Sequence, residues 1–171
     1  MWTMIIREMI SKDLEQVQKI ALATWRNTYS SFIPLQIQDK VLKDAYSENE
    51  MNNRFKNSLN LVFENNNEIL GYAFFSGDLL SNDIFLESLY IHPQHQGKGI
   101  GKQLMQFGIA KYNNPKTLSL VVYKGNKSIS FYEKMGLKVT NRNNGEFFGH
   151  PVVFIVMKKE LDNSNSTSYQ K

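Results

Sequence analysis

The stretch from Ser88 to Lys102 reads Ser-Leu-Tyr-Ile-His-Pro-Gln-His-Gln-Gly-Lys-Gly-Ile-Gly-Lys and joins an apolar strand pattern to a helical pattern. Glycines occupy alternate positions 97, 99 and 101. This spacing lets successive backbone N–H groups turn toward one point, and the N-terminus of the following helix adds its dipole. With Lys98 and Lys102 supplying positive charge, the loop predicts a site for a mono- or diphosphate group.

Two well-known phosphate loops differ from this one. A dinucleotide-binding fingerprint has Gly-x-Gly-x-x-Gly early in a βαβ unit, whereas this loop has Gly-x-Gly-x-Gly and comes late in the chain. A Walker A loop needs Ser or Thr directly after Gly-Lys, but Gln103 follows Gly101-Lys102. The alternative to a phosphate site is a tight strand-to-helix turn in which glycine serves shape alone.

Strand and helix patterns alternate on both sides of the loop and predict an α/β (α+β) fold. Residues 1–160 read as a single domain, and the polar residues 161–171 as a disordered tail. The expected turn between the last two strands is Asn141–Gly145. Strands are expected at 4–7, 61–64, 69–76, 84–91, 118–123, 137–140 and 152–157, and helices at 11–29, 37–42, 47–59, 104–110 and 127–135.

Composition excludes several classes of site and partner. The chain has 171 residues and no cysteine, so a disulfide framework, a thiolate nucleophile and a cysteine metal site are excluded. The three histidines, His92, His95 and His150, lack an i, i+4 spacing, and no metal is expected. A net charge of +4 without a basic block of five residues does not indicate a nucleic-acid partner.

Hydropathy predicts neither a membrane segment nor a leader. The apolar stretches are shorter than the ~20 residues that a spanning helix needs. Met1–Glu8 carries charges and lacks the apolar region of a signal peptide. The expected location is therefore the cytoplasm.

Two motifs together resemble a known family. Gln96-Gly97-Lys98-Gly99-Ile100-Gly101 is similar to the Gln/Arg-x-x-Gly-x-Gly/Ala signature of the GNAT superfamily of N-acetyltransferases. Phe131-Tyr132-Glu133-Lys134-Met135-Gly136-Leu137 resembles that family's Phe-Tyr-x-x-x-Gly-Phe. The resemblance implies a central mixed, mostly antiparallel sheet of about seven strands flanked by helices.

The resemblance also implies that acetyl-coenzyme A is the co-substrate. The glycine loop would hold its pyrophosphate, and the strand before the loop would pair with the pantetheine arm. Carried over residue by residue, the expected coenzyme contacts are Leu89, Tyr90, Ile91, Gln96, Gly97, Lys98, Gly99, Ile100, Gly101, Lys102, Asn126, Ser130 and Tyr132.

N-acetyl transfer requires a neutral attacking amine and a proton for the departing thiolate. Tyr132 is the expected general acid, because a phenol with a pKa of about 10 keeps its proton at neutral pH. By the resemblance it lies near the thioester sulfur. The alternative is a tyrosine that packs beside Phe131 without a chemical role.

Glu87 is the expected base or amine contact. It interrupts the apolar run Ile84-Phe85-Leu86, so the carboxylate is expected to be partly desolvated and suited to accept a proton. The alternatives are a carboxylate on an exposed strand face and a structural partner for a lysine.

The acceptor is expected to be a polyamine or another small amine. The helix end from Trp25 to Pro34 and the strand from Glu87 to Ile91 resemble bacterial enzymes that acetylate spermidine and spermine. Trp25, Tyr29 and Glu87 are therefore expected to contact the acceptor in a monomer or homodimer. A protein N-terminal or lysine acetyltransferase, and a coenzyme A-binding regulatory module without turnover, remain as alternatives.

Overall fold

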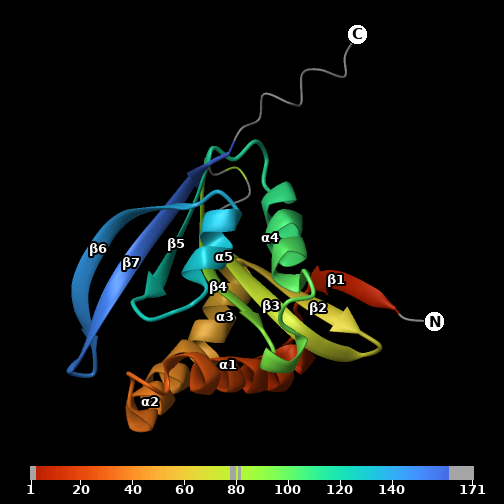
Figure 1. The fold of residues 1–171 in the computed structure, drawn as a ribbon. Coiled ribbons are helices and arrows are strands. Elements are labelled where there is room, and N and C mark those ends of the chain that lie inside the picture. The colour runs from red at the N-terminus through yellow and green to blue at the C-terminus, as the bar shows by residue number, and fades with distance from the viewer. Residues whose placement is uncertain (1–2, 78–79, 81, 162–171) are drawn as a thin grey trace.

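The computed structural model describes residues 3–77, 80 and 82–161, which form a seven-stranded sheet with helices on both faces (Figure 1). The strands are β1 (Met4–Glu8), β2 (Leu59–Asn65), β3 (Glu68–Ser76), β4 (Asp83–Ile91), β5 (Thr117–Tyr123), β6 (Lys138–Phe147) and β7 (His150–Glu160). The helices are α1 (Leu14–Tyr29), α2 (Leu35–Ala45), α3 (Glu48–Asn57), α4 (Ile100–Ala110) and α5 (Ile129–Lys134), with short 3-10 turns at Ser11–Asp13 and Pro93–His95.

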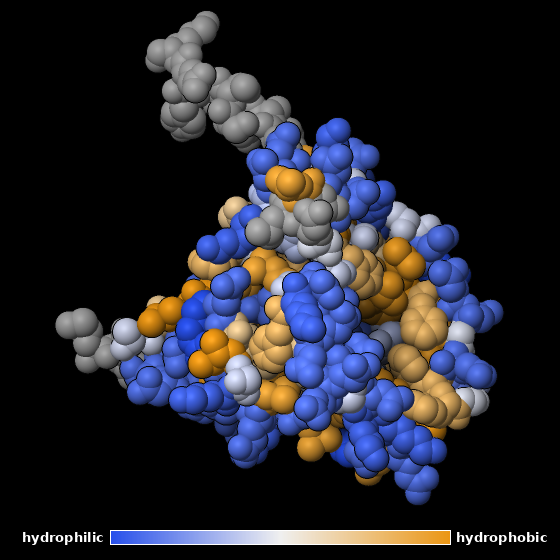
Figure 2. Space-filling model, turned by 180° about the vertical axis from the view of Figure 1, so that it is seen from behind, coloured by the Kyte–Doolittle hydropathy of each residue, from blue (hydrophilic) through white to orange (hydrophobic). Residues whose placement is uncertain are grey.

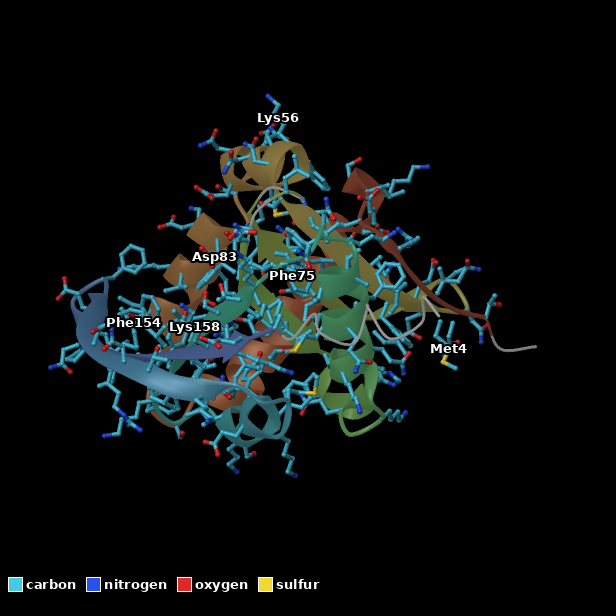
Figure 3. All side chains as sticks on the ribbon, turned by 90° about the horizontal axis from the view of Figure 1, so that it is seen from above. Met4, Lys56, Phe75, Asp83, Phe154 and Lys158 are labelled. Atoms are coloured by element: carbon cyan, nitrogen blue, oxygen red, sulfur yellow. The ribbon has the colours of Figure 1, made fainter. Side chains whose placement is uncertain are left out.

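The strands follow the order β1-β2-β3-β4-β5-β7-β6. Met4 on β1 and Phe154 on β7 lie toward opposite ends of this sheet (Figure 3). All neighbouring strands are antiparallel except β4 and β5. The predicted mixed, mostly antiparallel α/β fold is therefore confirmed.

The central strands are buried on both faces because their side chains alternate between two cores. Leu61 and Phe63 of β2, with Phe75 of β3, pack in the core that contains α4 and α5. The intervening Val62 and Phe74 pack in the core formed with α1 and α3. The sheet is thus the middle layer, with α4 and α5 on one face and the first three helices on the other.

The parallel pair β4–β5 is short. Its register begins at Asp83↔Thr117 and ends at Leu86↔Leu120. Beyond that point β4 continues to pair with β3, and β5 with β7. The facing edges of β4 and β5 are consequently unpaired over the last part of each strand.

The face of the molecule seen in Figure 2 is mainly hydrophilic. Figure 2, which views the molecule from behind, shows apolar side chains interspersed among hydrophilic ones, most continuously on the side where β6 and β7 lie. Phe148, at the tip of that hairpin, is 53% exposed. In the part of the chain that is described, no helix has the length and apolarity needed to cross a membrane.

The predicted turn at Asn141–Gly145 is wrong, because these residues continue strand β6. The β6–β7 ladder continues from Asn141↔Val156 to Phe147↔His150, and the chain reverses at Phe148 and Gly149, where φ is positive. As the last strand in the sheet order, β6 pairs with β7 alone and is mostly exposed. A strand with little to bury can have a sequence as polar as that of a turn.

Several helix boundaries also differ from the prediction: the helices predicted at 37–42 and 104–110 extend over Leu35–Ala45 and Ile100–Ala110. The helix expected to reach Leu59 ends at Asn57, since Leu59 already pairs with Phe75 in the sheet. The helix expected over 127–135 is restricted to Ile129–Lys134. The predicted tail lies, beyond Leu161, outside the described residues.

Helix α4 approaches the sheet so closely that Gly108 has no room for a side chain. A Cβ at this position would lie 2.2 Å from Cε2 and 2.3 Å from Cζ of Phe75, which lies at the centre of the molecule beside α4 (Figure 3). Helix propensity favours alanine over glycine by about 1 kcal/mol, whereas overpacking a core costs about 1–3 kcal/mol. Packing should therefore decide the effect of a substitution here.

We expect Gly108→Ala to lower the free energy of unfolding by about 1–2 kcal/mol, because the steric cost outweighs the gain in helix propensity. The measurement is urea unfolding followed by circular dichroism. Gly101→Ala in the same helix is the control, since its Cβ would meet its nearest neighbour at an ordinary 3.4 Å, and its stability should be equal to or higher than that of the parent. A gain in stability for Gly108→Ala would contradict the packing argument.

Candidate active site

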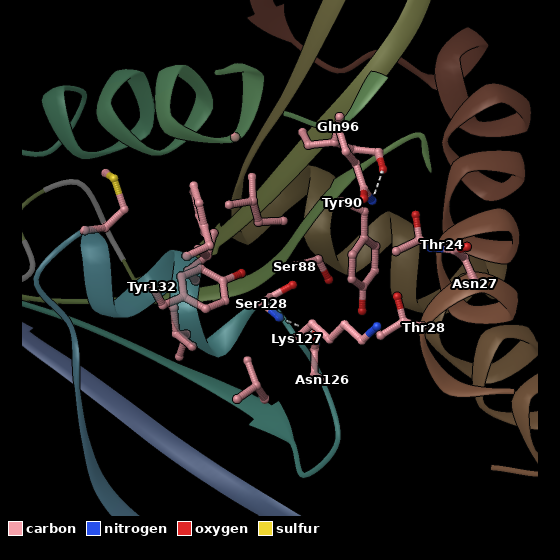
Figure 4. A pocket seen from close by; sticks show the side chains of 18 of the residues that line it. Thr24, Asn27, Thr28, Ser88, Tyr90, Gln96, Asn126, Lys127, Ser128 and Tyr132 are labelled. Atoms are coloured by element: carbon pink, nitrogen blue, oxygen red, sulfur yellow. Dashed lines mark hydrogen bonds between the residues drawn. The ribbon is translucent and has the colours of Figure 1, made fainter. Parts of the chain in front are cut away.

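A cavity of about 860 Å³ opens where β4 and β5 part. Both strands contribute to its walls, together with the glycine loop, the loop that leads into α5, α5 itself and one face of α1 (Figure 4). The backbone edges of residues 88–91 and 121–123 have no partner in the ladder between these two strands. An extended ligand can therefore add to the sheet here through main-chain hydrogen bonds.

Glu87 is the extra residue of a β-bulge in β4. The register with β3 moves from Phe74↔Ser88 to Phe75↔Leu86, which leaves Glu87 without an opposite residue. Its position directly follows Leu86, the last β4 residue paired with β5. The bulge thus coincides with the point at which the two strands separate.

Glu87 is partly withdrawn from solvent and is paired with a cationic side chain. Its side chain is 32% exposed, and its Oε2 lies 3.5 Å from Nε of Arg54. Arg54 is itself largely buried and lies over the rings of Tyr46 and Phe74. Glu87 therefore combines an ion pair on one side with access to the cavity on the other.

The glycine loop forms the entry to α4. Gly97 and Gly99 have φ values of 79° and 81°, a left-handed conformation that side chains with a Cβ rarely adopt. Gly99 is the N-cap, so the first N–H groups of α4 have no partners within the helix. Helix dipole and free N–H groups together favour an anion at this position. Gln96 stabilises the loop by donating its Nε2–H to the carbonyl of Ile91 at 3.1 Å.

Tyr132 projects from α5 into the cavity and is buried. In Figure 4 its hydroxyl points toward β4, where Ser88 lies. No described residue hydrogen-bonds to this hydroxyl. Burial raises the pKa of Tyr132 above its usual value, and the nearby Tyr90 adds to the rise. The phenol is therefore a proton donor that stays protonated at neutral and mildly alkaline pH.

Asn126 lines the cavity, but its side chain is already engaged. Its amide donates to the hydroxyl of Tyr29 at 2.9 Å, and its carbonyl oxygen accepts from the N–H of Ser128 at 2.8 Å. These bonds fix the loop between β5 and α5 against the end of α1. Tyr29, a predicted acceptor contact, is part of the same wall.

Three of the predicted contacts do not line the cavity. Trp25 is buried in an aromatic cluster and donates its indole N–H to the Tyr90 hydroxyl at 3.1 Å. Ser130 is exposed and bonds back to the carbonyl of Lys127. Lys98 is exposed, and its Nζ lies 3.4 Å from Nδ1 of His95. The other predicted site residues all lie along the cavity: Tyr29, Glu87, Leu89, Tyr90, Ile91, Gln96, Gly97, Gly99, Ile100, Gly101, Lys102, Asn126 and Tyr132.

One wall of the cavity was not expected from the sequence. Thr24, Asn27, Thr28 and Ser31 line it from α1 and its C-terminal end. Their i, i+3, i+4 and i+7 spacing is a helical signal, but it marks a polar face, which ordinarily indicates solvent exposure. Ser88 and Lys127 were also missed, since only the folded chain brings them to the same cavity.

Comparison with known proteins agrees with this geometry. The acetyltransferase (GNAT) domain matches residues 10–161. A spermidine N(1)-acetyltransferase of Thermoplasma acidophilum is 26% identical over 151 residues, covering 83% of this chain and 92% of that protein. An L-amino acid N-acyltransferase of Escherichia coli is 32% identical over 111 residues, covering 60% and 64%.

Two solved structures share the fold. The PaiA N-acetyltransferase of T. acidophilum, in complex with coenzyme A, has a TM-score of 0.80 at 24% identity and covers 93% of this chain and 99% of its own. The acetyltransferase YncA of Salmonella typhimurium, solved with acetyl-coenzyme A, has a TM-score of 0.67 at 26% identity and covers 94% and 95%. The predicted family is therefore confirmed, and the chain belongs to the GNAT acetyltransferases, enzymes that use acetyl-coenzyme A as their co-substrate.

Proposed function

We propose that this enzyme transfers the acetyl group of acetyl-coenzyme A to the primary amine of a small molecule. The observation that carries the proposal is the parting of β4 and β5, which opens a cavity with a glycine loop at the start of α4 and a buried phenol on α5. Polyamines are the acceptor class that the spermidine-acetylating relative supports. Purified protein incubated with acetyl-coenzyme A and a panel of amines, with N-acetylated products identified by mass, tests the activity directly.

The cavity suits the two chemically different parts of the coenzyme. The pyrophosphate would bind to the free N–H groups at the start of α4, with Lys102 supplying positive charge. The pantetheine arm, which carries amide groups, would pair with the open edge of β4 from Leu89 to Ile91. This arrangement would direct the thioester toward the bulge at Glu87.

In the proposed reaction the neutral amine attacks the thioester carbonyl directly. A C–N bond forms, the C–S bond breaks, and the sulfur would receive a proton from the Tyr132 hydroxyl, which then regains a proton from solvent. The attacking nitrogen would lose a proton to Glu87, directly or through water, or to solvent where Glu87 only binds the acceptor. No covalent intermediate on the protein is needed, in keeping with a chain that has no cysteine.

Coenzyme binding should depend on the left-handed backbone at Gly99. We expect Gly99→Val to weaken acetyl-coenzyme A binding at least about tenfold, or ~1.4 kcal/mol, because the distorted loop no longer presents its N–H groups together. Calorimetric titration measures the affinity. Gly149→Val is a matched control, since Gly149 has a φ of 84°, has nothing within 4 Å of an added Cβ and lies outside the cavity. Equal affinities for the two variants would contradict the assignment of the loop.

Proton donation should depend on the Tyr132 hydroxyl. We expect Tyr132→Phe to lower the single-turnover rate by about 10²–10⁴-fold at saturating coenzyme, the usual scale for a general acid. Coenzyme affinity should change far less, because the hydroxyl acts mainly in the transition state. Wild-type enzyme should not lose its donor below pH 10, since burial raises the pKa of this phenol.

Tyr112→Phe is the control for removing a tyrosine hydroxyl. Tyr112 lies outside the cavity, and burial raises its pKa to about 12. Its variant should keep the parent rate. A single-turnover rate for Tyr132→Phe within about threefold of the parent, far below the general-acid scale, would make Tyr132 a packing residue.

A further inference from the structure

The wall that α1 contributes to the cavity is polar and uncharged. Thr24, Asn27 and Thr28 extend from α1 toward the cavity, opposite Tyr90 of β4 (Figure 4). Ser31 continues this wall beyond the C-terminal end of the helix. Hydroxyl and amide side chains both donate and accept hydrogen bonds, so this wall complements a neutral polar group. It provides no counter-charge for a cation.

The hydroxyl of Thr24 is able to form a hydrogen bond with a ligand. The residue is 7% exposed, and its Oγ1 is buried without a hydrogen-bond partner among the described residues. A buried hydroxyl without a partner destabilises the free protein. A ligand group that bonds to Thr24 would remove this cost, so the position favours a bound partner of polar character.

The charge of the cavity opposes a second cationic group on the acceptor. Glu87 is the one carboxylate among the described residues that line the cavity, and it is already paired with Arg54. Lys102, Lys127 and Lys134 line the same cavity. In Figure 4 the Lys127 side chain extends from the loop after β5 toward α1 and Thr28. When the amine of the acceptor is bound at Glu87, the rest of the acceptor is therefore surrounded by cationic and neutral side chains rather than by carboxylates.

We infer that the acceptor is recognised by its single reacting amine together with an uncharged hydroxyl or amide that binds the α1 wall at Thr24 and Thr28. A second ammonium group on the acceptor weakens productive binding. The inference rests on the proposed acetyl transfer and narrows its acceptor class from small amines in general to monoamines with a neutral polar group. It therefore departs from the polyamines that the spermidine-acetylating relative supports.

Three amines with the same four-carbon chain test this inference: 4-aminobutan-1-ol, 1,4-diaminobutane and 4-aminobutanoate. We expect kcat/KM for the hydroxyl compound to exceed that for the diamine by about tenfold, because only the diamine must place a second cation against a wall that offers no counter-charge and lies near Lys127. The carboxylate compound should also exceed the diamine. A diamine used as well as or better than the alcohol overturns the inference and leaves the proposed transferase intact. Transfer to none of the three, while another primary amine of the panel is acetylated, overturns the inference alone. Transfer to no amine of the panel, with coenzyme bound, overturns both.

Thr24→Val tests whether the Thr24 hydroxyl binds the acceptor. The change keeps the side-chain shape and removes the unpartnered hydroxyl, so the melting temperature of the free protein should stay equal or rise. KM for 4-aminobutan-1-ol should rise about fivefold to tenfold, while the affinity for acetyl-coenzyme A, measured by calorimetry, stays within twofold, since one neutral hydrogen bond is lost from the acceptor alone. The preference for the alcohol over the diamine should shrink by the same factor.

Thr140→Val is the matched control, because Thr140 is an exposed residue of β6 outside the cavity. Its kinetic constants should equal those of the parent. Thr28→Val provides a second variant on the α1 wall and should shift KM in the same direction as Thr24→Val. An unchanged KM in both α1 variants, or a loss confined to coenzyme affinity, would show that the α1 wall does not bind the acceptor.

Discussion

The separation of β4 from β5 after Leu86 and Leu120 is the constraint on which the site depends. Each strand remains fixed by its other neighbour, since β4 pairs with β3 up to Ile91 and β5 pairs with β7 up to Tyr123. The two open edges therefore cannot close onto each other without breaking those ladders. Unpaired backbone N–H and C=O groups inside a protein raise its free energy. A ligand that forms hydrogen bonds with these groups removes that cost, which favours its binding.

Aromatic side chains fill one end of the space between β4 and β5. Trp25 donates to the hydroxyl of Tyr90 on β4, and its ring packs against Tyr123 on β5 at 5.8 Å. The ring of Tyr29 packs against those of Trp25 and Tyr123, with ring centroids 4.7 Å and 5.5 Å away. Helix α1 thus spans the ends of both strands. Of the aromatic pair predicted to bind the acceptor, Trp25 lies within this cluster and Tyr29 lines the cavity.

The sequence predicts well those features that arise from local chemistry. The glycine loop and the phenol of α5 can be recognised within a few neighbouring residues, and both lie in the cavity. Features that depend on distant contacts were missed. Glu87 is separated from Arg54 by more than thirty positions, and no residue type marks the bulge at which Glu87 lies. Residues 141–145 of β6 were predicted as a turn because an edge strand has little apolar surface to bury.

The distribution of charge in the cavity also suggests a link between the two substrates. Among the described residues, Lys102, Lys127 and Lys134 give the cavity an excess of positive charge over the carboxylate of Glu87. Phosphates at the start of α4 would offset part of that charge, and an ammonium entering afterwards would meet a weaker repulsion. Because coupling between two ligands is reciprocal, a bound amine would equally strengthen the binding of the coenzyme. Electrostatics would thus couple the binding of the two substrates even where they share no contact.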